Sequence, residues 1–329
     1  MQTRVWREAR GIPRALERTL AEARGFDDVV ALVAAQNVRR VIVSGNGAAF
    51  YVAHALWLAS LEGESGFELV AVPAGVLASS RFAWREGDRL VVVSSSGELR
   101  DAVEALEGGA PRPYAVITAN KRSRLGAGAG AAALVHVEEQ ETETHTQAYC
   151  GNLAAAFAIW ARVAGDRDLS ESLATAPGVL SRLLDEAEAW AAGAADDVGV
   201  PSAAVVFGSG PAWAAALEAA LLLKEVAGVP AEGLETREGA TSGMYALGPG
   251  HLALSLPTWE DRGLAEAEKT CRRIGASVLR LPGGDALDAR LAGLATFPAA
   301  LALATELGLR AGLDVDHPAW VDAYYRAAR

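Results

Sequence analysis

The same short pattern occurs twice in this chain: an apolar strand, a tight glycine turn and an alanine-rich helix. The first copy is VIVSGNGAAFYVAHAL at residues 41–56, and the second is SAAVVFGSGPAWAAALEAALLLKE at residues 202–225. Buried Val- and Ile-rich strands that alternate with helices are typical of parallel sheets covered on both faces. Because the pattern restarts in the second half, we expect two similar α/β domains that arose by duplication.

Further strands and helices surround these two copies. Residues 1–38, 98–106 and 144–164 have helical periodicity. Short apolar runs predict the other strands, at 68–73, 88–97, 113–120, 133–139, 251–258 and 276–283. We therefore expect N-terminal helices over 1–38, a first domain over 39–165, a helical linker over 166–200 that breaks at Pro177-Gly178, and a second domain over 201–329.

Composition and charge exclude several classes of function. The formal net charge of −11 argues against nucleic acid or an anionic membrane as the main partner. The two cysteines, Cys150 and Cys271, give neither a disulfide framework nor a zinc spacing. The N-terminus has no apolar segment of a secretory signal, and charges or glycines interrupt the apolar stretches before they could span a bilayer. A cytoplasmic protein is the simplest interpretation.

The glycine turns do not have the pattern of a dinucleotide site. That pattern needs a third glycine, but Phe50 and Trp213 stand at this position in the two copies. The chain also lacks GxxxxGK[ST], so a P-loop is excluded. A tight strand-to-helix connection without a ligand remains an alternative, above all for the second turn.

The serine run VVVSSSGEL predicts a phosphate site. Ser94, Ser95, Ser96 and Gly97 stand where a buried strand meets a helix; we expect Ser96 to cap that helix and Glu98 to lie in its first turn. Hydroxyls and free helix-end N–H groups together can hold one phosphate, whereas capping alone would need only one hydroxyl. The first glycine turn should lie beside this run, because the carboxyl ends of parallel strands meet at one edge. The two turns predict a pocket for a small phosphorylated ligand.

Several ordered motifs resemble the sugar isomerase (SIS) phosphosugar-binding family, in particular the isomerase half of glucosamine-6-phosphate synthases and related deaminases. They are REARGIPRALERTL, SGNGAAFYVAHA, VVVSSSGELRDAVEAL, FGSGPAWAAALEAALLLKEVAGVPAEGLE and GLRAGLDVDHP, and they extend over essentially the whole chain. The resemblance implies two tandem flavodoxin-like SIS domains, a homodimer with a site shared between subunits, and a phosphosugar ligand. It begins at Met1, so we expect no glutaminase domain.

The resemblance also assigns the ligand-binding residues. The serine run would hold the sugar phosphate, and the turn formed by Gly45, Asn46, Gly47 and Ala48 would form the sugar-side wall. The family usually has further hydroxyls at three positions that are Ala48, Ala49 and Leu99 here. The phosphate site is therefore expected to have fewer donors than is usual in the family.

For catalysis, the resemblance points to Glu225 as the base. Exchange between an aldose and a ketose moves a proton between C1 and C2 of the open sugar, and one carboxylate can carry it. A helix-end charge paired with a basic residue is the alternative interpretation of Glu225. Glu232 and Glu238 are similar to family glutamates that shape the site.

Three family residues are replaced. The synthase has a ring-opening histidine, contributed by the partner subunit, where this chain has Thr241, and a Schiff-base lysine where it has Ala323. Another family lysine is replaced by Leu222. Chemistry through a lysine imine is therefore not expected.

Histidines could replace the lost acid. His145 stands in a stretch that lines the sugar pocket in the family, and His317 lies in the C-terminal tail; a solvated loop histidine is the alternative interpretation of His145. We expect His54 to be a packing residue and His136 to lie within a strand. No histidine and carboxylate spacing predicts a metal site, and no cofactor is implied.

Two functions remain open. The first is an aldose–ketose isomerase or deaminase that acts on an aminosugar phosphate or another 6-phosphosugar, which the retained Glu225 and tail favour. The second is a binding or sensor protein that has lost catalysis, which the replaced histidine and lysine favour. A structural scaffold would explain neither the serine run nor Glu225.

Overall fold

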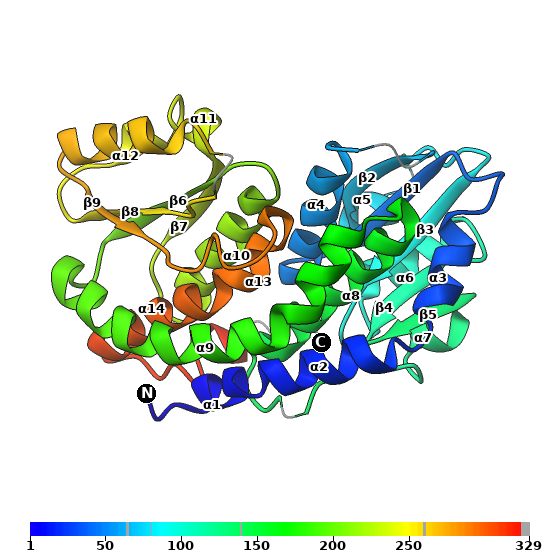
Figure 1. Cartoon of the computed structure of the whole chain (residues 1–329), viewed down its shortest axis with the longest axis horizontal. Coiled ribbons are helices and arrows are strands. Elements are labelled where there is room, and N and C mark those ends of the chain that lie inside the picture. The colour runs from blue at the N-terminus through cyan, green and yellow to red at the C-terminus, as the bar shows by residue number, and fades with distance from the viewer. Residues whose placement is uncertain (64–65, 80, 139, 259–260, 324–329) are drawn as a thin grey trace. The chain divides into compact units, whose positions relative to one another are not determined.

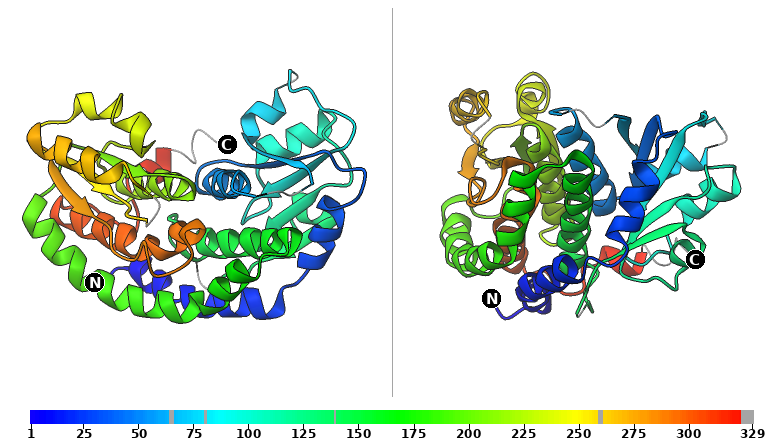
Figure 2. Two further views of the ribbon diagram at one scale, coloured as in Figure 1. Left: turned by 45° about the horizontal axis from the view of Figure 1, so that its top comes forward. Right: turned by 45° about the vertical axis from the view of Figure 1, so that its right-hand side comes forward.

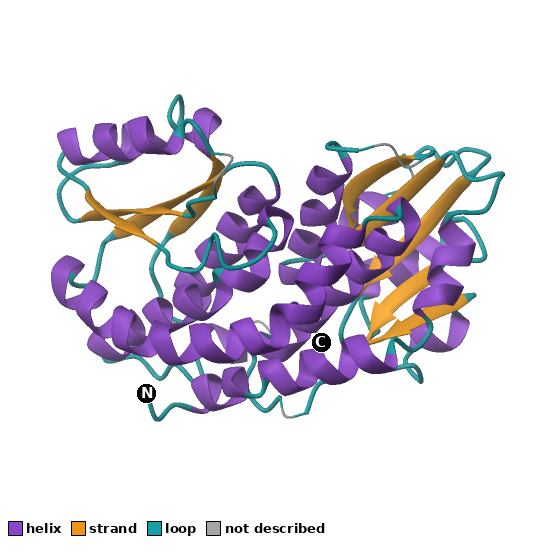
Figure 3. Cartoon of the chain, in the orientation of Figure 1, coloured by secondary structure: helices purple, strands orange, loops and turns teal. Residues whose placement is uncertain are grey.

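The computed structural model describes residues 1–329 except 64–65, 80, 139, 259–260 and 324–329. The chain folds into two compact units. The first-sheet unit contains residues Arg14–Glu138 and Gln147–Pro177, and the second-sheet unit contains Met1–Pro13, Glu139–Thr146 and Gly178–Arg329. Each unit has one sheet with helices around it, drawn in orange and purple in Figure 3. Both units therefore combine segments that are far apart in the sequence.

The first sheet is entirely parallel, with strand order β2-β1-β3-β4-β5. Strand β1 lies between β2 and β3 and pairs with both in register, so that Arg40 lies opposite both Glu68 and Asp88. The strands are β1 (Arg40–Gly45), β2 (Glu68–Pro73), β3 (Asp88–Val93), β4 (Ala115–Thr118) and β5 (Ala131–Leu134).

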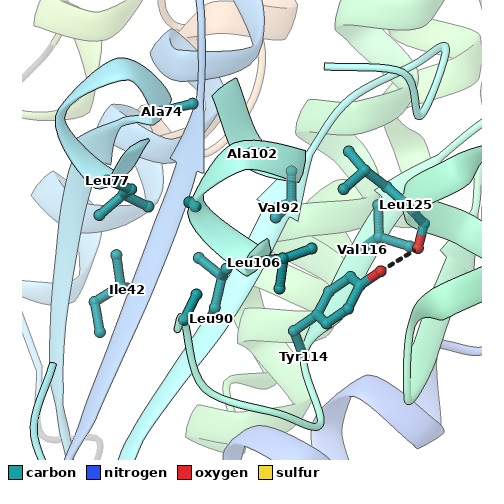
Figure 4. Packing of buried hydrophobic residues seen from close by; sticks show 12 residues of the cluster. Ile42, Ala74, Leu77, Leu90, Val92, Ala102, Leu106, Tyr114, Val116 and Leu125 are labelled. Carbon is teal, nitrogen blue, oxygen red and sulfur yellow. Dashed lines mark hydrogen bonds between the residues drawn. The ribbon is translucent and has the colours of Figure 1, made fainter. Parts of the chain in front are cut away.

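Helices cover both faces of the first sheet because successive side chains of a strand point to opposite faces. On one face, Ile42, Leu90, Val92 and Val116 pack against α5 (Ala74–Ala78), α6 (Arg100–Glu107) and α7 (Arg124–Gly128), as Figure 4 shows. On the other face, Val41, Val43, Val91 and Ile117 line an apolar cavity with side chains of α3 (Phe26–Val33), α4 (Ala48–Ser60) and α8 (Thr146–Ala164). These helices surround the sheet in Figure 1 and Figure 2.

The second sheet repeats this topology with strand order β7-β6-β8-β9. Val205 and Phe207 face η1 (Gly243–Ala246) and α12 (Leu264–Arg273) in one apolar cluster. On the opposite face, α10 (Pro211–Glu225) lies so close to Gly233 that a Cβ there would be 2.5 Å from the N atom of Leu217. The strands are β6 (Ala203–Gly208), β7 (Ala231–Glu235), β8 (His251–Ser255) and β9 (Ser277–Arg280).

The other helices include one apolar segment. Residues Ala289–Arg310 are long and apolar enough to cross a membrane, but 94% of that window is buried inside the structure, as in the core helix of a globular protein. This length differs from the sequence prediction, in which every apolar stretch is too short to span a bilayer. The remaining elements are α1 (Arg4–Arg10), α2 (Ile12–Glu22), α9 (Arg167–Val198), α11 (Thr236–Gly239), η2 (Ala289–Leu291), α13 (Ala292–Ala295) and α14 (Phe297–Arg310).

The two glycine turns have the same backbone conformation. Gly47 has φ 54° and ψ −134°, and Gly210 has φ 55° and ψ −140°. The preceding glycines allow the helix to approach the strand, because a Cβ on Gly45 would lie 2.7 Å from the carbonyl carbon of Ala49. Together with the matching strand orders, this confirms the predicted fold class of two similar α/β domains.

Two local predictions are wrong. No break occurs at Pro177-Gly178, because α9 continues through Pro177. Proline lacks the N–H that a helix interior normally uses, but the side chains of Leu173, Ala176 and Leu180 are buried before and after Pro177, and this packing stabilises the helix there. The fifth strand ends at Leu134 rather than at residue 139, since its partner β4 ends at Thr118. His136 therefore lies outside the strand.

Candidate functional site

The serine run forms a tight turn directly after β3. Ser94 is 6% exposed, and its N–H donates to the carbonyl of Ile117 over 3.0 Å. The Ser94 hydroxyl accepts the N–H of Gly97 at 3.1 Å, and Gly97 has a left-handed φ of +68°. The carbonyl of Ser95 accepts the N–H of Ala119 at 3.0 Å. Hydrogen bonds within the turn and to residues 117–119 therefore fix its conformation.

The turn leaves donors available for an anion. Among the described residues, no acceptor is bonded to the backbone N–H of Ser95 or of Ser96. The Ser95 hydroxyl accepts Nδ2 of Asn152 in α8 at 2.9 Å. Asn152 is 2% exposed, and its Oδ1 has no hydrogen-bond partner in the described part of the chain. Successive free N–H groups beside hydroxyls are a common arrangement for binding phosphate.

Ser96 does not cap a helix, which corrects the sequence prediction. The helix α6 begins at Arg100, its N-cap is Leu99, and that cap makes no side-chain hydrogen bond. Gly97 turns the chain before the helix starts, so the hydroxyl of Ser96 instead accepts the N–H of Glu98 at 3.2 Å.

Glu98 is exposed and lies before α6 rather than in its first turn. Its carboxylate accepts the backbone N–H of Arg124 at 3.0 Å and Nε of the same residue at 2.6 Å. These hydrogen bonds lower the pKa of Glu98. Its role in the structure is to tie the serine turn to the start of α7.

The first glycine turn lies at the carboxyl end of β1, which pairs with β3. Asn46 is exposed and links this turn to two helices: its Nδ2 donates to Asp101 at 2.8 Å, and its Oδ1 accepts the N–H of Ala74 at 3.2 Å. Gly47 is exposed and Ala48 is half-buried at the start of α4. The structure therefore brings the two predicted turns to one edge of the sheet.

Glu225 is the last residue of α10 and is half-buried. Burial raises its pKa to about 7, and the neighbouring Lys224 opposes this shift only in part. The carbonyl of Glu225 accepts Nε1 of Trp320 at 3.1 Å, so the C-terminal tail packs against this helix end. A carboxyl group that titrates near neutral pH can both take up and release a proton there.

Glu218, two helical turns before Glu225, was not predicted from the sequence. It is 3% exposed, and its Oε2 has no hydrogen-bond partner among the described residues. Burial and the charge of Glu225 raise the pKa of Glu218 well above its usual value. The sequence feature that could have indicated Glu218 is its position as a single carboxylate within the apolar run AWAAALEAALLL.

The glutamates after α10 are mostly exposed. Glu232 lies exposed in β7, and Glu238 lies exposed in α11, where its Oε2 accepts the hydroxyl of Ser242 at 3.0 Å. Thr241 is exposed and donates its hydroxyl to the carbonyl of Glu238 at 2.9 Å. The contacts of the described residues join neither Glu232 nor Glu238 to Glu225.

A third carboxylate in this segment, Glu235, was not predicted. It caps α11 by accepting the N–H groups of Arg237 and Glu238, each at 2.9 Å, and it accepts the hydroxyl of Ser209 at 3.1 Å. The second glycine turn is thus bonded through Ser209 to the carboxylate that caps α11.

The two candidate histidines lie on irregular segments of the second-sheet unit. His145 is exposed, and its Nδ1 contacts Nε2 of Gln140. Desolvation lowers the pKa of His145, and the charges of Glu143 and Glu8 oppose this shift. His317 is exposed and lies 3.6 Å from Asp322, and Asp314 accepts its backbone N–H at 3.0 Å.

The other histidine predictions can be checked directly. His54 is 6% exposed and packs between Phe50 and Trp57, as expected for a packing residue. His136 donates its backbone N–H to Thr19, and its ring contacts Glu22. Within the described ranges, no group of three or more His, Cys, Asp or Glu side chains could hold a metal ion.

The two parallel sheets, the paired glycine turns and the serine turn define a protein with the sugar isomerase (SIS) fold. Comparison with models of known families gives no match, and comparison with curated protein sequences gives none either. The similarity of this chain to known proteins is therefore seen in its structure.

Three solved structures illustrate it. The C-terminal domain of glucosamine-fructose-6-phosphate aminotransferase from Francisella tularensis superposes with a TM-score of 0.78 at 17% identity, over 96% of this chain and 98% of that one. Glucosamine-6-phosphate deaminase from Thermotoga maritima gives 0.72 at 19% identity, over 93% and 96%. Tagatose-6-phosphate ketose/aldose isomerase from Escherichia coli gives 0.75 at 19% identity, over 94% of each chain.

Proposed function

We propose that this protein is an aldose–ketose isomerase or deaminase that acts on an aminosugar phosphate or another 6-phosphosugar. The observation that carries the proposal is Glu225, whose carboxyl group is half-buried at the end of α10 with a pKa of about 7. Titration near neutral pH is what a proton-transferring carboxylate needs, and ordinary surface glutamates do not have it.

The phosphate of the substrate binds at the serine turn. The free N–H groups of Ser95 and Ser96, the polar wall from Asn152 and the fixed backbone at Gly97 support this assignment. The first glycine turn forms the sugar-side wall through Gly45, Gly47 and the start of α4.

Glu225 acts on the open-chain sugar. Its carboxylate removes the proton from C2 of the aldose while the carbonyl oxygen on C1 is protonated, which gives an enediol. Return of the proton to C1 and loss of the hydroxyl proton on C2 gives the ketose. We propose that His145 supplies the acid that opens the ring, and that Glu232, Glu238, Thr241 and His317 line the sugar.

A ligand panel tests this function. Glucosamine-6-phosphate, fructose-6-phosphate, glucose-6-phosphate and tagatose-6-phosphate are each added at millimolar concentration in a thermal-shift assay, with inorganic phosphate and the free sugars as controls. At one hundred times Kd a ligand stabilises the folded state by about 2.7 kcal/mol, so a rise of several degrees in Tm is expected for the correct phosphosugar. Hits are then assayed for isomerisation and ammonia release. A panel in which no phosphosugar raises Tm above its free sugar contradicts the proposal.

A phosphosugar sensor without catalysis is the second candidate. It is favoured by Thr241 and Ala323, which stand where the synthase family has its acid and its lysine, and by the hydrogen bond that already engages the Thr241 hydroxyl. A phosphosugar that raises Tm without any turnover would favour the sensor.

We also propose that the protein is a cytoplasmic homodimer. The apolar helices and the exposed side chains of Tyr245, 80% exposed in η1, and Leu61, 66% exposed, support an association of two chains. Light scattering at micromolar concentration is expected to give twice the monomer mass of 34.2 kDa. A monomer mass under these conditions would contradict the dimer.

A further inference from the structure

The short helix α1 is hydrogen-bonded to two segments that are distant in the sequence, and all three belong to the second-sheet unit. One segment, residues 140–145, carries His145. The other, residues 314–317, carries His317 and leads into the tail whose Trp320 is bonded to Glu225. The carboxylates of Glu8 and Asp316 make these connections by accepting hydrogen bonds.

Glu8 holds the segment with His145. It is 3% exposed, and its Oε1 accepts the backbone N–H of Glu141 at 2.7 Å and of Thr142 at 2.9 Å. Its Oε2 accepts the hydroxyl of Thr142 at 2.5 Å. Residues 141–145 form neither helix nor strand, so they cannot pair their backbone N–H groups within regular structure. Glu8 is therefore the acceptor that fixes this segment three residues before His145.

Asp316 holds the tail to the other end of the same helix. Its carboxylate accepts the N–H of Arg4 and of Val5, each at 2.8 Å. The first N–H groups of a helix have no partner within it, and a negative charge is favourable there. Asp314 supports the turn by accepting the N–H of Asp316 at 3.1 Å and of His317 at 3.0 Å.

The segments are thus linked one after another by contacts within one compact unit. From Glu225 the contacts run through Trp320 to the tail, through Asp316 to α1, and through Glu8 to the segment of His145. Arg4 strengthens the connection, because its N–H donates to Asp316 while its guanidinium pairs with Glu141 at 3.1 Å.

We propose that Glu8 and Asp316 are positioning residues, which attach the segments of His145 and His317 to one helix and so fix both histidines relative to Glu225. The proposal rests on the proposed function for its kinetic consequences, but the positions of the rings can be tested without turnover. A ring-opening acid must be held within hydrogen-bond reach of the sugar, so a loosened segment should reduce kcat more than it weakens phosphate binding.

The test uses the full chain with labelled histidines, whose five ring signals are recorded by NMR. Glu8→Gln replaces one acceptor oxygen by an NH₂ group that cannot accept the donors of Thr142. We expect the signals of His145 to shift or broaden, while those of His54 in the first-sheet unit stay unchanged. Glu8→Asp should restore them in part. Glu266→Gln is the control, because Glu266 is an exposed carboxylate in α12 of the same unit that pairs with Lys269.

Kinetics on the phosphosugar identified by the panel give a second readout. Glu8→Gln should lower kcat at least tenfold and change KM less than threefold, and Asp316→Asn should perturb the signals of His317. If Glu8→Gln does not fold, Thr142→Val removes one donor and is expected to shift the His145 signals in the same direction. Folded variants with unchanged His145 signals overturn the proposal. Shifted signals in a protein without turnover support the positioning role and refute the isomerase instead.

Discussion

Replacing Glu225 by Gln is expected to lower kcat by about 10²- to 10⁴-fold and to leave phosphosugar binding within a fewfold of the wild-type value. General base catalysis contributes rate factors of this size, and Gln has nearly the same shape but cannot take up the proton. Glu266→Gln serves as the control, because this glutamate is 78% exposed in α12 and pairs only weakly with Lys269 at 3.7 Å.

The pH dependence sharpens this prediction. Glu225 must be ionised to remove a proton, and burial raises its pKa to about 7. The rate should therefore rise with pH through about 7 and then level off, whereas an ordinary glutamate would already be fully ionised above pH 6. Isomerisation assays between pH 5 and 9 measure this, together with calorimetric titration for binding. A rate that Glu225→Gln leaves unchanged, or that is flat across this range, would remove Glu225 as the base.

The second large effect is expected for Gly97→Ala in the serine turn. Gly97 has φ +68°, and a Cβ at this position would lie 1.9 Å from Oγ of Ser123. That hydroxyl cannot move aside freely, because it donates to the carbonyl of Asn120 at 2.6 Å and accepts the N–H of Gly126 at 3.1 Å. Left-handed strain of about 1–2 kcal/mol and overpacking of about 1–3 kcal/mol add up to a loss of several kcal/mol in the free energy of unfolding.

A matched control separates strain from the collision. Gly165 has a similar φ of +65°, but a Cβ there would meet nothing within 4 Å, so Gly165→Ala should lose only the strain contribution. Denaturant unfolding gives both values, and the thermal shift with a phosphosugar should vanish for Gly97→Ala alone. Equal losses in the two variants, with ligand binding retained in both, would show that the tight contact at Gly97 does not shape the site.

Local sequence signals predict the sheets and turns well, for physical reasons. Apolar strands followed by glycine must bury both faces, so the two strand–turn–helix copies are recognisable from their residues alone. The close approach of Ala49 to Gly45 and the left-handed Gly47 explain why glycines stand there. The expected pairing of the serine turn with the first glycine turn at one sheet edge follows from parallel strand order.

Predictions that depended on partners distant in the sequence could not be made in this way. Whether Ser96 would cap a helix depended on the left-handed turn at Gly97, which lies against Ser123, and the end of β5 depended on the length of β4. The bonds from Glu8 to Thr142 join residues that are 134 positions apart, which no periodicity reveals. Burial of Glu218 likewise depends on what packs against α10.

The membership of the two compact units has a consequence for how such a chain can change during evolution. The polypeptide passes from one unit to the other after Pro13, Glu138, Thr146 and Pro177. Exchange of genetic material at the middle of the chain would therefore separate α1 and the segment with His145 from the sheet unit to which they belong. Recombination between relatives should succeed where all segments of a unit are inherited together, so the two sheet units of this chain are expected to evolve together.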